Sequence, residues 1–344
     1  MFGKEIIGLT EKVLPFVPIK YLRILGDCIS DVVVADSQTD QSVELSIGDV
    51  CFSLWLSAGL SAAGRNTYLR MNRTGDVYEL AMVTCLQSIL DQESEPVFMD
   101  LGAYAGYYSC YAAAYKTDRW SVYAVESNSE HCKNICRSID GNGYKNVTVL
   151  NTVLSDQEEL LTVYKESVAN EDHLKGLTNL ERNEIARRQQ ILRDGVRQQS
   201  ETIDSLCERE TIYPTVLKVD VRGSEGKVLA GASHILTNSL NYILLEVHPE
   251  EMLMQYSPGH TRRSIIQTLN DAGFNCYLIA GFRTTKRSPE YKHLLATGEL
   301  SFHLIAMDNF ETVFFDRNGT DVFVLAVKDT IDISVLPCFA EVAK

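Results

Sequence analysis

The sequence lacks any apolar run of the roughly 18–20 residues that a membrane-spanning helix needs. Its first 25 residues carry six charged side chains, which interrupt the apolar core that a signal peptide requires. Pro15 and Pro18 also break an amphipathic anchoring helix over Ile6–Ile24, and we interpret this part as an ordinary N-terminal extension. We therefore expect a cytoplasmic protein without a transmembrane segment.

Positive charge is scarce, with 32 Lys and Arg against 46 Asp and Glu and a net charge of −14. So acidic a chain repels a phosphate backbone at long range, and non-specific nucleic-acid binding is not expected. Paired cysteines are also lacking. Of nine cysteines only Cys132 and Cys136 are close together, and no second pair follows at zinc-site spacing. We expect reduced thiols and no metal.

What is present is an ordinary globular composition, 45% hydrophobic and 23% charged. From Asp76 onward predicted strands and helices alternate, which indicates an α/β fold with an open, doubly wound sheet. The predicted helices are Asp76–Leu90, Tyr107–Tyr115, Ser129–Asp140 and Arg262–Ala272. The predicted strands are Val97–Leu101, Ser121–Val125, Asn146–Leu150, Thr215–Val219, Asn241–Val247, Phe274–Ala280 and Asp321–Val327.

This alternation divides the chain into residues 1–75, an extension with short strands near 42–47 and 51–57, a main domain over 76–330, and a tail over 331–344. Two insertions, about 157–200 and 281–320, exceed ordinary connections. Each follows a strand whose carboxyl end faces the predicted ligand, so both are expected to overhang it. Both are rich in basic residues. They form either a solvated surface or an electropositive rim for an anionic, for example phosphorylated, acceptor.

A glycine loop, Asp100-Leu-Gly-Ala-Tyr-Ala-Gly106, ends the first predicted strand. Gly102 allows a tight turn and a close approach of the backbone to a ligand, and Gly106 lets the next helix begin beside the strand. The amides of that helix N-terminus suit a carboxylate. Asp100 would order the loop or meet an ammonium, and Glu126, which ends the next strand, would accept hydrogen bonds from both ribose hydroxyls.

The spacing of the two glycines weighs against a dinucleotide cofactor. The loop reads G-x-x-x-G and not G-x-G-x-x-G, and Tyr104 stands where a glycine would approach the pyrophosphate. A nicotinamide or flavin cofactor is therefore disfavoured. The alternative without a ligand is that the two glycines only turn the chain.

Polar side chains at the ends of two later strands point to the same edge of the sheet, because the carboxyl ends of parallel strands line the ligand site. Asp220 and His248 follow these strands, and Lys218 and Glu246 precede them by two residues on the same face. We predict that Lys218 pairs with Glu246 across the strands. His248 is the first candidate for a general base and Asp220 the second; alternatively, His248 is a loop histidine beside Pro249.

These segments, in this order, resemble the FkbM-type methyltransferases from about Asp76 to Val247. The resemblance rests on Val97–Gly106, Val122–Glu126, Glu201–Leu206, Leu217-Lys-Val-Asp-Val-Arg-Gly223 and Leu244–His248. It implies the class I methyltransferase fold, in which the last strand is antiparallel, and S-adenosylmethionine as cofactor. It also implies methyl transfer, commonly to a hydroxyl of a sugar or a small natural product.

Carried over residue by residue, the resemblance implies a cofactor site. The strand ends, and not the resemblance, give Arg222 and Glu246 as candidates for substrate binding and His248, Asp220 and Lys218 as catalytic candidates. The cofactor would lie against Asp100, Gly102, Ala103, Tyr104, Gly106 and Glu126, with Ser155 or Asp156 near the adenine and Glu79 at the methionine end.

One residue departs from the family pattern K-x-D-x-E-G, because Arg222 replaces the acid. Three interpretations remain open. Glu225 substitutes from the next turn, or Arg222 binds an anionic substrate, or the chain is a catalytically inactive cofactor-binding module that recognises a partner.

Overall fold

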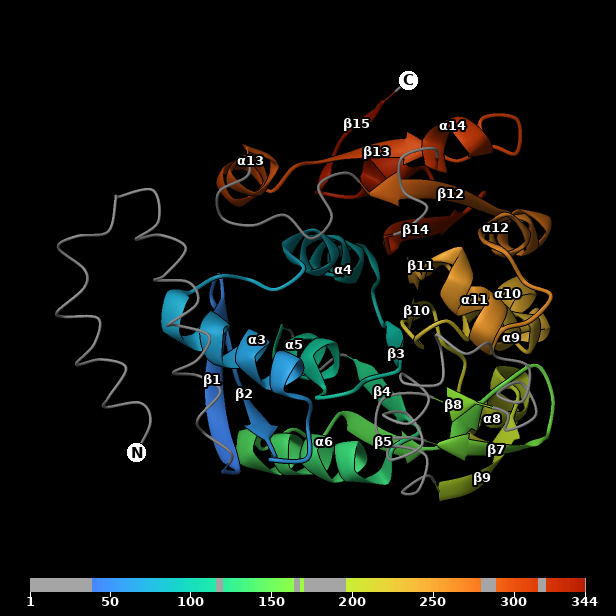
Figure 1. Ribbon diagram of the computed structural model, residues 1–344. Coiled ribbons are helices and arrows are strands. Elements are labelled where there is room, and N and C mark those ends of the chain that lie inside the picture. Colours follow the sequence, from blue (N-terminus) through green and yellow to red (C-terminus); the bar gives the residue numbers. More distant parts are fainter. Residues whose placement is uncertain are drawn as a thin grey trace, which may run out of the picture.

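A computed structural model describes residues 39–115, 120–163, 168–169, 196–279, 289–314 and 320–343 (Figure 1). Its main feature is a nine-stranded sheet with the order β15-β13-β12-β14-β11-β10-β3-β4-β5. The strands are β3 (Val97–Leu101), β4 (Ser121–Glu126), β5 (Val147–Asn151), β10 (Val216–Val219), β11 (Tyr242–Val247), β12 (Phe274–Ile279), β13 (Leu300–Leu304), β14 (Val322–Lys328) and β15 (Phe339–Ala343).

The pairing of these strands confirms the predicted fold class. Strands β11, β10, β3, β4 and β5 are parallel, whereas β14 runs antiparallel between β11 and β12. This is the class I methyltransferase order. Every residue of β10 and β11 is buried, as expected for strands covered by helices on both faces.

Helices connect the strands and cover the sheet. They are α4 (Leu80–Gln92), α5 (Tyr107–Tyr115), α6 (Ser129–Asn142), α8 (Ile203–Glu210), α9 (Glu225–Ala230), α10 (Ser233–Asn238), α11 (Glu250–Tyr256) and α12 (Arg262–Asp271). Asn128 caps α6, Thr202 caps α8 and Thr261 caps α12, and each side chain accepts a hydrogen bond from a backbone N–H of the first turn. In the part of the chain described, no helix is both long and apolar enough to span a membrane.

The described part of the N-terminal extension forms the antiparallel hairpin of β1 (Gln41–Ile47) and β2 (Val50–Leu56), followed by α3 (Ala62–Thr74). The sequence predicts the two strands but not α3. β2 lies against α5 and α6 (Figure 1), where the amide of Trp55 donates to Ser138 Oγ at 2.8 Å. The ring of Phe52 also packs against that of Tyr107, 6.0 Å between centroids. This extension therefore shares the core of the main domain.

The two predicted insertions differ in what they build. In the first, β7 (Leu160–Val163), β8 (Val168–Ala169) and β9 (Val196–Glu201) form a small sheet with β6 (Val153–Leu154). The second contributes α13 (Pro289–Thr297), β13 and α14 (Phe310–Phe314). Because β13 pairs with β12 and with β15, it extends the central sheet. The tail is joined to the same sheet through β15. The electropositive rim is predicted from the basic residues of these two insertions. Most of those residues lie outside the part of the chain that the structure describes: Arg182, Arg187, Arg188, Arg193, Arg283, Lys286 and Arg287.

A buried guanidinium joins the end of β11 to the segment before β14. Arg262 is 1% exposed and donates from Nε to the carbonyl of His248 at 3.0 Å and from a terminal nitrogen to the carbonyl of Thr320. We expect Arg262→Met to lower the free energy of unfolding by about 3 kcal/mol, because it removes the donor to the buried carbonyls of Val247 and His248 and to the carbonyl of Thr320. The adjacent Arg263→Met, which removes an exposed ion pair with Glu311, should cost less than about 1 kcal/mol. Urea denaturation compares the two; equal losses would contradict this role of Arg262.

Candidate functional site

A cavity of about 570 Å³ opens at the carboxyl ends of β3, β4, β10 and β11. Residues from the glycine loop and from each of these strand ends line it, and α3 of the N-terminal extension forms a further wall. The polar and aromatic side chains that line it include Ser61, Tyr68, Tyr78, Glu79, Tyr104, Tyr108, Glu126, His131, Lys218, Asp220, Arg222, Glu246, His248 and Asp321.

The glycine loop is held in place by a steric requirement at Gly102. This residue has φ +75°, and a Cβ placed on it would lie 2.0 Å from the carbonyl oxygen of Asp220. The loop can therefore approach β10 only with glycine at this position. The close approach brings Asp220 next to the predicted cofactor loop.

Gly102→Ala is expected to prevent stable folding, or to lower the free energy of unfolding by at least about 3 kcal/mol, because a backbone atom has to move. Gly75→Ala is the matched control. Gly75 has φ +67° but no heavy atom within 4 Å of the added Cβ, so its cost should be about 1 kcal/mol. Denaturant unfolding of both variants tests this, and a Gly102 variant as stable as the Gly75 variant would contradict it.

Tyr104 connects the loop to two other parts of the chain. It has φ +52°, which is unusual for a bulky residue, and its amide donates to Glu126 Oε2 at 2.9 Å. Its hydroxyl lies 3.0 Å from Ser61 Oγ, at the cap of α3, and accepts from the Ser61 amide at 3.2 Å. Tyr104 thus occupies a strained position that hydrogen bonds at both of its ends stabilise.

Glu126 is a buried, ionised carboxylate at the end of β4. Its Oε1 accepts from the amide of Asn128 at 2.8 Å, and His131 Nδ1 lies 3.6 Å away. Burial alone would raise the pKa of Glu126, but His131 and the amides of Asn128 and Tyr104 together lower it. Oε1 also accepts from the hydroxyl of Ser127 at 3.4 Å, a long bond that a ligand hydroxyl can replace, and Oε2 can accept a further hydrogen beside the Tyr104 amide.

Asp100 and Lys218 lie beneath the cavity on neighbouring strands. Asp100 is fully buried, accepts from Ser109 Oγ at 2.7 Å, and lies 3.4 Å from Lys218 Nζ. Lys218 Nζ is also 3.7 Å from Asp220 Oδ2 and 4.9 Å from the centre of the Tyr108 ring. Burial alone would lower the pKa of Lys218, but Asp100, Asp220 and other carboxylates, Glu246 among them, raise it above its ordinary range. The sequence predicts Glu246 as the partner of Lys218; in the structure the ion pairs of Lys218 are with Asp100 and Asp220, and Glu246 acts on it only through its charge.

Glu79 begins α4 and projects a second buried carboxyl group into the cavity. It is 8% exposed, and its Oε2 accepts from the hydroxyl of Tyr108 at 2.6 Å. Burial raises the pKa of Glu79, and the charge of Asp220 raises it further. Its Oε1 is buried and has no hydrogen-bond partner among the described residues, which leaves an acceptor for a ligand.

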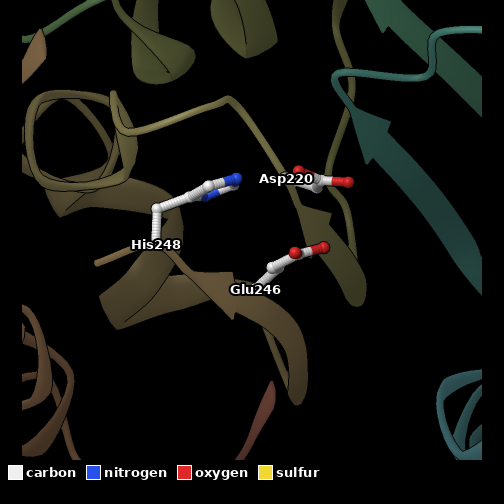
Figure 2. Close-up of side chains that lie close together, drawn as sticks. All are labelled: Asp220, Glu246 and His248. Atoms are coloured by element: carbon white, nitrogen blue, oxygen red, sulfur yellow. The ribbon is translucent and has the colours of Figure 1, made fainter. Parts of the chain in front are cut away.

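His248 is oriented by Glu225, a fully buried residue of the first turn of α9. His248 Nδ1 lies 2.8 Å from Glu225 Oε1, which also accepts from the amide of Gly223 at 3.0 Å. With the proton on Nδ1, Nε2 of His248 carries a lone pair. The close-up shows His248 directed toward Asp220, with Glu246 below both (Figure 2).

Asp220, Glu246 and His248 each offer one ligand atom, and these atoms lie within 4.8 Å of one another (Figure 2). Such a set could hold a metal ion, and Glu225 would then orient the histidine ligand. The ammonium of Lys218 lies beside Asp220, so this residue faces both the set and a positive charge of the protein. The three side chains are therefore candidates for binding a cationic group at this end of the cavity.

Arg222, which replaces the acid of the family pattern, has another acid close to it in the structure. Arg222 has φ +53° and lines the cavity, while Glu225, three residues later, reaches the site through His248. A buried carboxylate is thus present beside the strand end although the family acid is not. This agrees with the interpretation that Glu225 substitutes from the next turn.

Some predicted cofactor residues line the cavity and others support it from outside. Glu79, Gly102, Ala103, Tyr104 and Glu126 line it. Asp100, Gly106, Ser155 and Asp156 are not among its lining residues. Ser155 is 1% exposed and donates to Asp156 Oδ1 or to Glu159 Oε1, each at 3.0 Å, while the preceding Thr152, Val153 and Leu154 reach the cavity.

The wall built by α3 and the place of His131 at the cavity are not evident from the sequence. His131 is 3% exposed, and its Nε2 has no hydrogen-bond partner among the described residues. Its ring lies edge-on to Tyr104 with 4.8 Å between centroids. The sequence feature that could have indicated His131 is its position in the first turn of the helix that follows Glu126. A side chain there lies close to the end of the preceding strand, and so to the ligand site.

Comparisons with known proteins identify the family. The Methyltransferase FkbM domain matches residues 100–276, just over half of the chain. A search of curated proteins finds no significant match.

Three solved structures with a similar fold are distant in sequence. One is a methyltransferase FkbM from Methylobacillus flagellatus, with 12% identity, 89% of this chain and 60% of that chain covered, and a TM-score of 0.39. The Aeropyrum pernix fibrillarin with bound S-adenosyl-L-methionine has 11% identity, coverage of 72% and 76%, and a TM-score of 0.37. The precorrin-6y C5,15-methyltransferase of Geobacter metallireducens has 14% identity, coverage of 72% and 88%, and a TM-score of 0.36.

The assignment rests on the domain match together with the strand order and the cavity at the carboxyl ends of the strands. The chain belongs to the FkbM family of S-adenosylmethionine-dependent methyltransferases.

Proposed function

We propose that this protein methylates a hydroxyl group of a small molecule, of the sugar or natural-product type, and that the cavity holds cofactor and acceptor together. The observation that carries the proposal is the pairing of His248 with the buried Glu225 at the edge of the cavity. A histidine oriented in this way can accept the proton that a hydroxyl loses when it is methylated.

The residues of the cavity fit S-adenosylmethionine. Glu126 can accept from the two ribose hydroxyls, and the glycine loop, which packs tightly against Asp220 at Gly102, lines the cavity where its backbone can contact the ligand. The free Oε1 of Glu79 can accept from the ammonium of the methionine end. When bound, the cofactor supplies an electrophilic methyl group, whose transfer requires an aligned nucleophile.

We assign the acceptor end of the cavity to Asp220, Glu246, His248 and Arg222. His248 Nε2 takes the hydroxyl proton, while Glu225 stabilises the resulting imidazolium. Asp220 accepts a hydrogen bond from the acceptor and is the second candidate for the base. Lys218 holds Asp100 and Asp220 in place from below.

The proposed base predicts a specific pH dependence. Burial alone would lower the pKa of His248, but Glu225, with Asp220 and Asp321, raises it above its ordinary value of about 6.5. Because the base acts when deprotonated, kcat should rise with pH and reach half its maximum above that value. Glu225→Gln should lower the plateau and move the rise to lower pH, since it removes the charge that raises the pKa. A pH profile that does not move would contradict the pairing.

A catalytically inactive cofactor-binding module is the second candidate function. It rests on Arg222, which replaces the acid of the family pattern. The Glu225–His248 pair weighs against it, because a module without catalysis does not need an oriented base.

Incubation with S-adenosylmethionine carrying a ¹³C-labelled methyl group and a panel of sugars, polyols and phenols tests the proposal. We expect a new ¹³C methoxy resonance with at least one acceptor. Cofactor binding without transfer to oxygen in any member of a broad panel would favour the inactive module.

A further inference from the structure

The cavity carries an excess of negative charge. Five carboxylates line it, against two side chains that are permanently positive, Lys218 and Arg222. The positive charge of Lys218 is also shared with Asp100, which is fully buried beneath the cavity. Counted with neutral histidines, the lining residues have an excess of three negative charges. The five carboxylates are Glu79, Glu126, Asp220, Glu246 and Asp321.

Most of this charge gathers around the proposed acceptor end. Glu126 lies at the nucleoside end, on the glycine loop. Asp220 and Glu246 lie beside His248 (Figure 2), and Asp321 is near enough to raise the pKa of His248. Glu79 is near enough to Asp220 for the two charges to repel each other. Like charges in a partly buried cavity are costly unless a ligand of opposite charge offsets them.

Glu79, near Asp220, adds a buried carboxyl group to the cavity, beside the place proposed for the methionine ammonium. Glu79 is 8% exposed, and its Oε1 has no hydrogen-bond partner among the described residues. The ring of Tyr108 beside it already lies 4.9 Å from an ammonium, that of Lys218, and the rings of Tyr68 and Tyr78 line the same cavity. Carboxylates and aromatic faces together are the surroundings that protein sites offer to organic cations.

The cofactor offsets only part of this charge. In S-adenosylmethionine the ammonium and the carboxylate cancel, and the sulfonium leaves one positive charge. An excess of two negative charges then remains in the cavity as a whole, and Asp220, Glu246 and Asp321 contribute to it at the acceptor end. An anionic acceptor would add to this repulsion, and a neutral acceptor would leave it unchanged.

Resting on the proposed function, we propose that the acceptor carries an ammonium group near the hydroxyl that is methylated, and that Asp220 and Glu246 bind this ammonium. Their ligand atoms lie within 4.8 Å of each other, and an ammonium with N–H···O distances of about 2.8 Å can donate to both. Held in this way the nitrogen stays protonated and is no nucleophile, so the neighbouring hydroxyl receives the methyl group. The acceptor class is therefore an amino alcohol or an amino sugar.

The test uses the full-length protein saturated with S-adenosylhomocysteine, whose binding is measured first by calorimetry. Saturation-transfer NMR then screens small molecules in matched sets: a hydroxylated amine, its N-acetyl form, its alcohol counterpart and its carboxylate or phosphate counterpart. We expect the amines to bind at least tenfold more tightly than their N-acetyl forms. Glu246→Gln should reduce this preference at least fivefold, whereas Glu44→Gln, which removes an exposed carboxylate on β1, should not change it.

The outcomes separate this inference from the proposed function. If S-adenosylhomocysteine does not bind, the proposed function fails. If it binds but the amines show no preference, or if carboxylates or phosphates bind better, only the ammonium assignment is overturned. A separate experiment measures the binding of Mn²⁺, added without other ligands, by electron paramagnetic resonance. Tight binding that Glu246→Gln abolishes would assign the carboxylates to a metal and overturn the ammonium site.

Discussion

Glu126→Ala should weaken the binding of S-adenosylmethionine by about 100-fold or more. The carboxylate is ionised and oriented by the amides of Tyr104 and Asn128, so that its remaining lone pairs are available to the two ribose hydroxyls. Hydrogen bonds to a charged group contribute about 1.5–3 kcal/mol each, and the loss of two of them corresponds to at least that factor. Calorimetric titration with the cofactor and with S-adenosylhomocysteine measures the effect.

Glu130→Ala is the matched control for this variant. Glu130 is an exposed acid four residues away, in the first turn of α6, and its carboxylate pairs with Lys133. Its removal should leave cofactor binding unchanged within about twofold, as usual for an exposed ion pair. Equal affinities of the Glu126 variant and the wild type would mean that the nucleoside lies elsewhere.

His248→Ala should lower kcat by about 10²- to 10⁴-fold, the usual contribution of a general base. The affinity for the cofactor should change little, because the assigned ribose contact is at Glu126, on another strand. His234→Ala, which removes an exposed histidine from α10, is the control and should keep full activity. Single-turnover kinetics with a hydroxylated acceptor separate the chemical step from binding. A wild-type kcat in the His248 variant would mean that His248 is not the base and that Asp220, the second candidate, is.

The parts of the fold that follow from local pattern could be predicted from the sequence. The strand ends at Leu101, Glu126, Val219 and Val247 agree with the structure to within one residue, since each apolar run ends at a glycine or at a polar side chain. The antiparallel position of β14 came from the resemblance. No local pattern could show it, because strand order depends on contacts between distant segments.

The α3 helix and its place at the cavity could not be predicted. Its sequence, Ala62–Thr74, is mostly polar and shows no clear apolar stripe, although Ser61 and Gly75 cap it correctly. Its place beside the cofactor loop depends on the contact between Ser61 and Tyr104, 43 residues apart. Such pairs leave no trace in the spacing of a single sequence.

For the candidate site, the sequence located the strand ends but not the partner of each polar side chain. His248 and Asp220 lie at the cavity as predicted. Whether Asp100 faces the ligand or supports the loop could be decided only by its burial against Ser109 and Lys218. Likewise, only the structure shows that Ser155, which follows β6, donates to Asp156 or Glu159 and does not line the cavity.

The most direct test of the account is a crystal structure of the protein with S-adenosylhomocysteine bound. We predict that both ribose hydroxyls donate to Glu126, that the methionine ammonium lies near Glu79, and that the sulfur faces the side of the cavity that holds Asp220 and His248. A nucleoside bound away from Glu126, or a sulfur directed away from His248, would contradict the assignment of this cavity to methyl transfer.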